Sequence, residues 1–127
     1  MADYVFDASA LLAIAFNEPG ADKAIARMAG ASISAVNYSE AGAKLIDKGL
    51  DPAEAFTWLD ALRLHVIDFD RDCARQAAAL RTGTRERRLS FADRACLAQA
   101  MKEDAVALTT DRVWAELDLA CGVELLR

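Results

Sequence analysis

The segment VFDAS, residues 5–9, places an acidic residue directly after a short apolar run. Tyr4, Val5 and Phe6 are typical of a buried strand, and the small and apolar residues from Ser9 to Phe16 are typical of a helix. Asp7 therefore stands where a predicted strand gives way to a helix. Taken alone, it has an ordinary explanation as a helix cap. The question is whether other segments bring further carboxylates to the same place.

The rest of the chain alternates between short strand patterns and helical patterns. Strands are predicted at 32–34, 65–67, 106–109 and 123–126, and helices at 21–28, around 38–46, after the cap at 51, at 70–80, at 90–102 and at 112–117. Residues 81–88 are predicted to form a polar loop. Such alternation favours an α/β fold with a mostly parallel sheet covered on both faces. At 127 residues, we expect one domain spanning 1–127.

Composition narrows the class of protein. The net charge of −5 argues against a protein that binds nucleic acid through a bulk basic surplus, although a metal-binding acidic cluster would hide local basic patches. Three dispersed cysteines, one histidine and no CxxC spacing argue against a zinc site and favour free thiols in a reducing compartment. Because the N-terminus has no basic leader and no spanning segment is apparent, we expect a cytoplasmic protein without a membrane anchor.

Four acids are candidates for a shared site. Asp7 and Asp111 each follow a predicted strand, and Glu40 and Asp93 lie in the first turns of predicted helices. Each one alone is explained by helix capping or by the helix dipole. Together, at one edge of a parallel sheet, they would repel one another unless a cation held them. Oxygen ligands without His or Cys favour Mg²⁺ or Mn²⁺, which activate water for phosphoryl transfer.

Four ordered blocks of this sequence resemble the PIN-domain ribonucleases, and in particular the VapC-type toxins of bacterial toxin–antitoxin pairs. The blocks are VFDASALLA, SAVNYSEAGAKL, LSFADRACLAQA and ALTTDRVWAEL, and they extend nearly from end to end of the chain. The resemblance implies a PIN-like three-layer α/β/α sandwich. It also implies that Asp7, Glu40, Asp93 and Asp111 form a catalytic metal centre, and that the hydroxyls of Ser9 and Thr109 support it.

The same resemblance implies an activity and partners. Members of this family cut RNA with metal-activated water and leave a 5′-phosphate and a 3′-hydroxyl. The toxins usually cut one structured RNA, commonly a tRNA or rRNA loop. They form homodimers that a small VapB-type antitoxin neutralises, and the antitoxin tethers the complex to operator DNA.

Several other residues are candidates for supporting the site. Asn37 is either a supporting residue near the acids or a helix cap. The arginines proposed to contact RNA phosphates are Arg85, Arg87 and Arg88, in the basic run that begins at Arg81, together with Arg94 and Arg112, each next to a proposed ligand. The basic run is equally well explained as a solvated loop, and the last two arginines as ion-pair partners of neighbouring acids. Trp114, like Trp58, is more typical of a core residue than of a base-stacking one.

Three other functional classes are compared with the sequence. A haloacid-dehalogenase-like phosphatase also places an Asp after its first strand, but it needs an acid two residues later, where this chain has Ser9, and a late lysine, for which Lys102 is the only candidate. A receiver domain would need an acidic pair that is absent from the first strand's end. A non-catalytic PIN-like binding module, acting on operator DNA through its antitoxin, is the main alternative.

Overall fold

One five-stranded parallel sheet forms the centre of the computed structural model, which describes residues 3–127. The strands are β1 (Tyr4–Phe6), β2 (Ser32–Ser34), β3 (His65–Ile67), β4 (Val106–Thr109) and β5 (Gly122–Leu125). They lie in the order β3-β2-β1-β4-β5, and every neighbouring pair is parallel. The predicted sheet is confirmed. Residues 1 and 2 of the predicted domain lie outside the described part of the chain.

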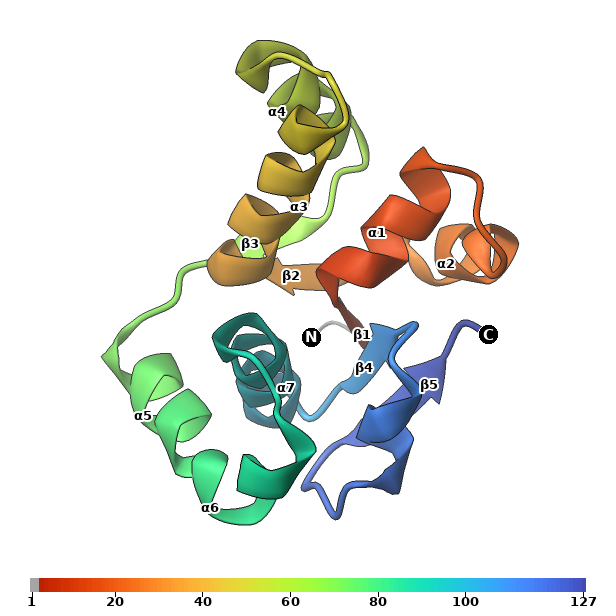
Figure 1. Ribbon diagram of the computed structural model, residues 1–127. Coiled ribbons are helices and arrows are strands. Elements are labelled where there is room, and N and C mark those ends of the chain that lie inside the picture. The colour runs from red at the N-terminus through yellow and green to blue at the C-terminus, as the bar shows by residue number, and fades with distance from the viewer. Residues whose placement is uncertain (1–2) are drawn as a thin grey trace.

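Helices cover both faces of this sheet (Figure 1). On one face lie α1 (Ala8–Ala15), α2 (Ala21–Arg27), α3 (Ala35–Asp47) and α4 (Pro52–Ala61). On the other lies α7 (Phe91–Glu103), with α5 (Arg71–Ala79) packed against it and α6 (Arg81–Thr84) beyond. Two short 3₁₀ helices, η1 (Arg85–Arg87) and η2 (Arg112–Glu116), complete the chain. The arrangement is the predicted three-layer α/β/α sandwich.

Successive side chains of β1 point to opposite faces of the sheet, and helices cover both faces, so the strand is apolar on both sides. Phe6 is fully buried and belongs to the core beneath α1–α4, whereas its neighbour Val5 belongs to the core beneath α7. Trp114 of η2 is also fully buried in the second core, so its predicted structural role is confirmed. A strand buried on both faces fixes the position of the residue that follows it.

The predicted helix starts are present with their capping contacts. Asp51 and Glu54 form a capping box at α4, and Ser90 and Asp93 form another at α7. Asp70 accepts from the backbone N–H of Cys73 at the start of α5, with a distance of 2.9 Å. α3 and α4 pack closely at Gly42. The ring of Phe56 lies where a Cβ atom on that residue would be, so only glycine allows this contact.

The prediction of a polar loop at 81–88 is wrong. Its first four residues form α6, the next three form η1, and Arg88 ends the segment in the left-handed region, with a φ of 56°. Leu80 keeps helical angles at the end of α5, and Thr84 is buried with its hydroxyl donating to the Leu80 carbonyl. Arginine is a good helix former, so a run of arginines does not by itself predict a loop.

Smaller differences concern element boundaries and type. The last strand begins at Gly122 rather than 123, and the predicted helix at 112–117 is a 3₁₀ helix. The cysteines are free, as predicted: Cys73 and Cys96 are buried and Cys121 is half-buried. Within residues 3–127, no helix combines the length and apolarity needed to cross a bilayer.

The strand order identifies the edge where a ligand would bind. The chain builds β1, β2 and β3 outward in one direction and then returns to place β4 on the other side of β1. In such sheets, ligands bind beyond the carboxyl ends of the strands at the point where the order reverses. That point lies between the ends of β1 and β4, where Asp7 and Thr109 are found.

Candidate functional site

Asp7 is the buried centre of the site. Its backbone N–H donates to the carbonyl of Leu108 at 2.9 Å, which ties it to β4, and only 5% of the residue is exposed. One carboxylate oxygen, Oδ1, accepts from the backbone N–H of Ala8 at 2.9 Å. The other, Oδ2, accepts from the hydroxyls of Ser9 at 2.7 Å and Thr109 at 2.8 Å. Both predicted supporting hydroxyls therefore contact this carboxylate directly.

The backbone that follows β4 fixes the orientation of these hydroxyls. The N–H of Thr110 donates to Ser9 Oγ, and the N–H of Asp111 donates to Thr109 Oγ1, each at 3.0 Å. With those N–H groups occupying their lone pairs, both hydroxyls direct their protons toward Asp7. The carboxylate is thus held by a network that joins α1 to the end of β4.

The pKa values of two acids show that the carboxylates influence one another. Burial raises the pKa of Asp7, and the negative charge of Asp93 raises it further, against the lowering effect of the Ser9 and Thr109 hydrogen bonds. Burial also raises the pKa of Glu40, as do the charges of Asp7 and Asp93, whereas the ammonium of Lys44 lowers it. Asp7, Glu40 and Asp93 therefore lie within electrostatic range of one another.

Glu40 and Asp93 reach this edge from α3 and α7. Glu40 lies in the second turn of α3 and Asp93 in the first turn of α7, and both are half-buried. Asp93 Oδ2 accepts from the N–H of Ser90 at 2.9 Å as part of the capping box. Its other oxygen, Oδ1, takes no part in that box.

Asn37 links the two helices that carry these acids. It is fully buried on α3, and its side-chain Nδ2 donates to the carbonyl of Ala92, the residue before Asp93, at 2.9 Å. Its Oδ1 is buried and has no hydrogen-bond partner among residues 3–127. Of the two explanations left open by the sequence, the structure thus gives Asn37 contacts between helices rather than a cap, which Ser34 provides for α3.

Asp111 uses one carboxylate oxygen at a helix start, as Asp7 and Asp93 do. Its Oδ1 accepts from the N–H of Val113 at 3.0 Å and caps η2. Within residues 3–127, no three His, Cys, Asp or Glu side chains stand close enough together to hold one metal ion as they are placed. Asp7, Glu40 and Asp93 thus lie within electrostatic range of one another without being gathered around one point, and Asp7, Asp93 and Asp111 each commit one oxygen to a helix start.

The donor set nevertheless fits a hard divalent cation. The acids at this edge offer carboxylate oxygens, and the nearest thiol, that of Cys96, is fully buried with a pKa raised well above its usual value, first by burial. A buried carboxylate with a second one in range is destabilised when both are charged, and a cation would relieve this. Oxygen-only ligation is what Mg²⁺ and Mn²⁺ prefer.

The proposed RNA-binding arginines differ in their surroundings: two contact other parts of the protein and three are exposed. Arg87 pairs with Glu116 at 3.2 Å, and Arg94 donates to the carbonyl of Ala77 on α5 at 3.0 Å. Arg85, Arg88 and Arg112 are exposed. Two cations that the sequence analysis did not single out, Lys44 and Lys48, follow Glu40 at intervals of four residues, and that helical spacing is the signal that could have identified them.

Comparisons with solved structures show the same fold. A chain in the structure of DNA-bound VapBC from Salmonella typhimurium matches with a TM-score of 0.78 and 16% identity over 100% of both chains. VapBC2 from Rickettsia felis bound to a promoter DNA fragment gives a TM-score of 0.75 and 19% identity, covering 95% of this chain and 96% of that one. A toxin–antitoxin complex from Klebsiella pneumoniae gives 0.74 and 21%, covering 98% of each.

Comparisons at the level of sequence identify a family but no individual curated relative. No curated protein sequence is significantly similar to this chain. The model of the PIN domain family, however, matches residues 4–119, which include all four acids. The chain therefore belongs to the PIN domain family.

Proposed function

We propose that this protein is a metal-dependent, site-specific endoribonuclease that acts as the toxin of a VapC-type toxin–antitoxin pair. Its substrate would be a structured RNA, a tRNA or rRNA, and its cofactor Mg²⁺, with Mn²⁺ as a substitute. The observation that carries the proposal is Asp7, a buried carboxylate at the reversal point of the sheet with two further acids in electrostatic range.

Each acid has a distinct part in the proposed site. Asp7, Glu40 and Asp93 would hold the metal, and Asp111 would join them through the oxygen that does not cap η2. A bound Mg²⁺ or Mn²⁺ supplies an activated water and neutralises charge on the phosphodiester. Ser9 and Thr109 fix Asp7 and favour its charged form, because both donate to the same oxygen and so lower its pKa against the effect of burial.

The phosphatase alternative finds little support in the geometry. Ser9 occupies the position of the required second acid and donates to Asp7. Lys102 lies nine residues after Asp93 on the same helix, hence about 14 Å further along its axis, and it pairs with Asp70 at 3.5 Å. Its ammonium is therefore held at the opposite end of α7 from Asp93, against Asp70.

The proposed partners follow from the likeness to toxin–antitoxin complexes. They are a VapB-type antitoxin, a second copy of this chain in a homodimer, and operator DNA reached only through the antitoxin. A non-catalytic binding module is the competing proposal, and it draws support from two similar structures described as DNA-bound complexes.

Cleavage of RNA by the purified protein tests the proposal. The protein, free of antitoxin, is incubated with a total small-RNA pool and separately with ribosomes, in Mg²⁺, in Mn²⁺ and in EDTA, and new 5′ ends are mapped. Discrete cuts that disappear in EDTA are expected. Asp93→Asn is the matched variant, because the amide keeps an acceptor for the Ser90 N–H while removing the charge.

The outcomes separate the two proposals. Cuts that persist in EDTA or in Asp93→Asn would come from a contaminating nuclease and not from this site. A folded protein that cuts neither RNA pool in either metal would favour the binding module.

A further inference from the structure

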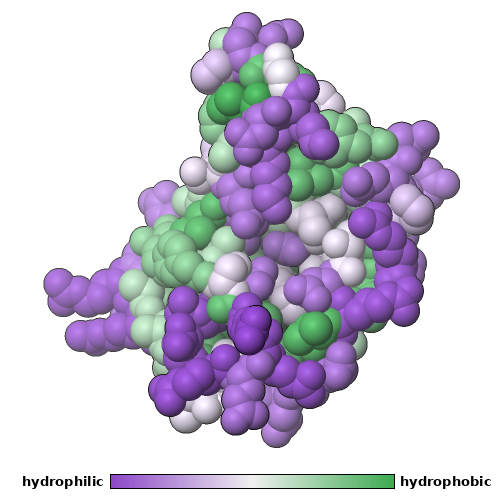
Figure 2. All heavy atoms as spheres, in the orientation of Figure 1, coloured by the Kyte–Doolittle hydropathy of each residue, from purple (hydrophilic) through white to green (hydrophobic). Residues whose placement is uncertain are grey.

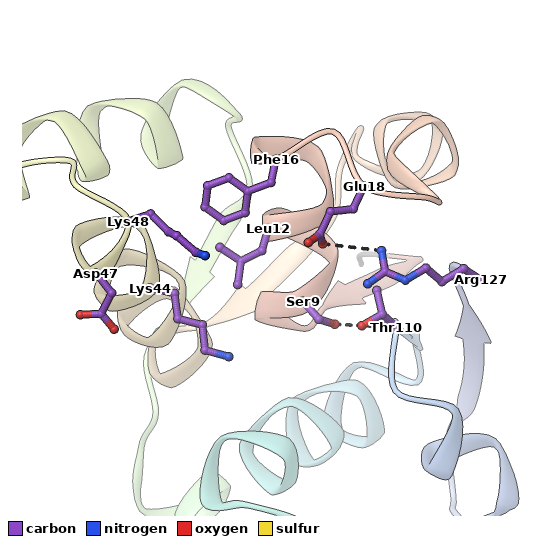
Figure 3. Close-up of a pocket in the computed structure, with 9 residues that line it drawn as sticks. All are labelled: Ser9, Leu12, Phe16, Glu18, Lys44, Asp47, Lys48, Thr110 and Arg127. Carbon is purple, nitrogen blue, oxygen red and sulfur yellow. Dashed lines mark hydrogen bonds and ion pairs between the residues drawn. The ribbon is translucent and has the colours of Figure 1, made fainter.

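A pocket opens directly beside the hydroxyls that hold Asp7. It has a volume of about 300 Å³ and lies between α1, α3 and the C-terminal end of the chain (Figure 3). Its lining residues are Ser9, Leu12, Phe16, Glu18, Lys44, Asp47, Lys48, Thr110 and Arg127. Figure 2 shows apolar atoms over α1 beside hydrophilic atoms over α3 on this face. Because Ser9 both lines the pocket and donates to Asp7, the pocket adjoins the proposed catalytic site.

A row of cations leads out of the acid cluster along one wall. Glu40, Lys44 and Lys48 are spaced at four-residue intervals, so they lie on one side of α3. Lys44 is close enough to lower the pKa of Glu40. Figure 3 shows the ammonium group of Lys48 pointing from α3 toward α1, and that of Lys44 pointing lower in the view. Within residues 3–127, neither lysine forms an ion pair, whereas Arg127 is paired with Glu18 at 3.6 Å. The two lysines are therefore available to an external anion.

The opposite wall carries an exposed aromatic ring. Phe16 ends α1 and is 38% exposed, although rings of this size are usually buried. The ammonium of Lys48 lies 5.9 Å from its ring centroid, so a cation and an aromatic face occupy the same end of the pocket. Grooves that bind single-stranded nucleic acid combine cations, which contact phosphates, with aromatic rings, on which bases stack.

We propose that the pocket between α1 and α3 is the subsite for the single-stranded RNA segment adjoining the scissile bond. Lys44 and Lys48 bind successive phosphates, and Phe16 stacks on a base. The inference rests on the proposed nuclease function. It places RNA contacts on α3, away from the arginines around η1.

Binding in a non-cleaving background tests the subsite separately from catalysis. The protein carries Asp7→Asn, and the probe is a short, fluorescein-labelled single-stranded RNA of mixed sequence, titrated by anisotropy over a range of salt. Each phosphate contact to a single strand contributes about 0.7 to the slope of log K against log salt, so Lys44→Gln with Lys48→Gln should lower the slope by about 1.4. Lys102→Gln, an exposed lysine at the far end of α7, is the control and should leave the slope unchanged.

Substitutions of Phe16 give a second readout. Phe16→Leu should weaken RNA binding roughly tenfold without changing the salt slope, because one stacked base is lost. Phe16→Trp should restore binding, since it returns an aromatic face. Equal affinities in both variants would overturn the stacking contact.

Failure of the subsite is distinguishable from failure of the nuclease proposal. RNA cleavage by the wild-type chain with an unchanged salt slope in the lysine double variant would overturn the subsite alone. A lowered slope with no cleavage in any metal would keep the subsite and overturn the nuclease. No RNA binding at all, or a pocket that takes a peptide of the antitoxin while the RNA slope is unaffected, would also overturn the subsite.

Discussion

Asp7 and Asp93 both stand at the start of a helix, but the structure surrounds them very differently. Asp93 is half-buried and belongs to a reciprocal capping box with Ser90, which accounts for its position without any ligand. Asp7 is 5% exposed and uses one oxygen for two hydroxyls that have no part in capping α1. The comparison shows that an acid with a local structural role carries little functional information, whereas a buried acid supported from a neighbouring strand carries much more.

The supporting network also distinguishes the two regions. Around Asp7 it joins residues about one hundred positions apart, because Thr109 belongs to β4 and Ser9 to α1. Around Asp93 the contacts span only three residues. Long-range contacts to a destabilised charge require the whole fold, so their presence needs a reason beyond local helix stability.

Replacing Asp7 should have the largest effect. Asp7→Asn should lower RNA cleavage by roughly a hundredfold or more, because a charge that stabilises the transition state through the metal is lost. The same change should raise the melting temperature of the metal-free protein, since it removes a buried charge while the rotatable hydroxyls of Ser9 and Thr109 still find partners. Cleavage rates and thermal unfolding measure the two effects.

The control for Asp7→Asn is Asp104→Asn. Asp104 is exposed at the left-handed end of α7, a backbone position that asparagine also adopts readily. It should leave cleavage and melting temperature unchanged. Full activity of Asp7→Asn would refute the assignment of this carboxylate.

Removing the hydroxyl that crosses from β4 should have the next largest effect, on stability. Thr109→Val leaves the N–H of Asp111 and Oδ2 of Asp7 short of a partner in a buried site, which costs about 1–3 kcal/mol. Thr110→Val is the matched control, because Thr110 contributes its backbone N–H to the network. Denaturant unfolding of both variants tests this, and equal stabilities would mean that the hydroxyl network adds nothing.

A pair of substitutions at α7 separates capping from catalysis. Ser90→Ala removes the cap and should cost about 1 kcal/mol of unfolding free energy while cleavage persists, since Asp93 remains. Asp93→Asn should keep that stability and lose cleavage. If Ser90→Ala abolished cleavage as completely as Asp93→Asn, the role of Asp93 would be structural.

Much of this arrangement could be predicted from the sequence because local signals agreed with the fold. The β1 segment at 4–6 and the β2 segment at 32–34 are predicted with their observed bounds, and the capping boxes at 51 and 90 mark two helix starts correctly. Alternation of strands and helices predicts parallel strands, whereas the strand order that makes β1 and β4 neighbours and places Asp7 at the reversal point comes from the structure.

The remainder depended on contacts that no local pattern encodes. The arginine-rich segment after Arg81 is helical because Thr84 is buried and bonded to Leu80, which composition does not reveal. The partner of Asn37 is a carbonyl 55 residues away, so its link to α7 required the tertiary structure. The exposure of Phe16 beside Lys48 is likewise a property of how α1 and α3 pack.

The smallest and most diagnostic effect is a pH dependence of stability in the metal-free protein. The pKa values of Asp7 and Glu40 are both raised in the folded state, chiefly by burial, from ordinary values of 3.8 and 4.5. Above those values the folded state holds more protons than the unfolded state, so the free energy of unfolding falls as pH rises toward the folded pKa values. Asp70, whose pKa is lowered first by its hydrogen bond with the Cys73 backbone, acts in the opposite direction.

The difference in the free energy of unfolding between wild type and Asp7→Asn isolates the Asp7 contribution. This difference should grow as pH rises from about 4. Mg²⁺ at neutral pH should then raise the melting temperature of wild type more than that of Asp7→Asn, because the cation stabilises the charge that the variant lacks. A difference that is flat with pH and insensitive to Mg²⁺ would mean that the hydrogen bonds of Asp7 within the fold are its whole role.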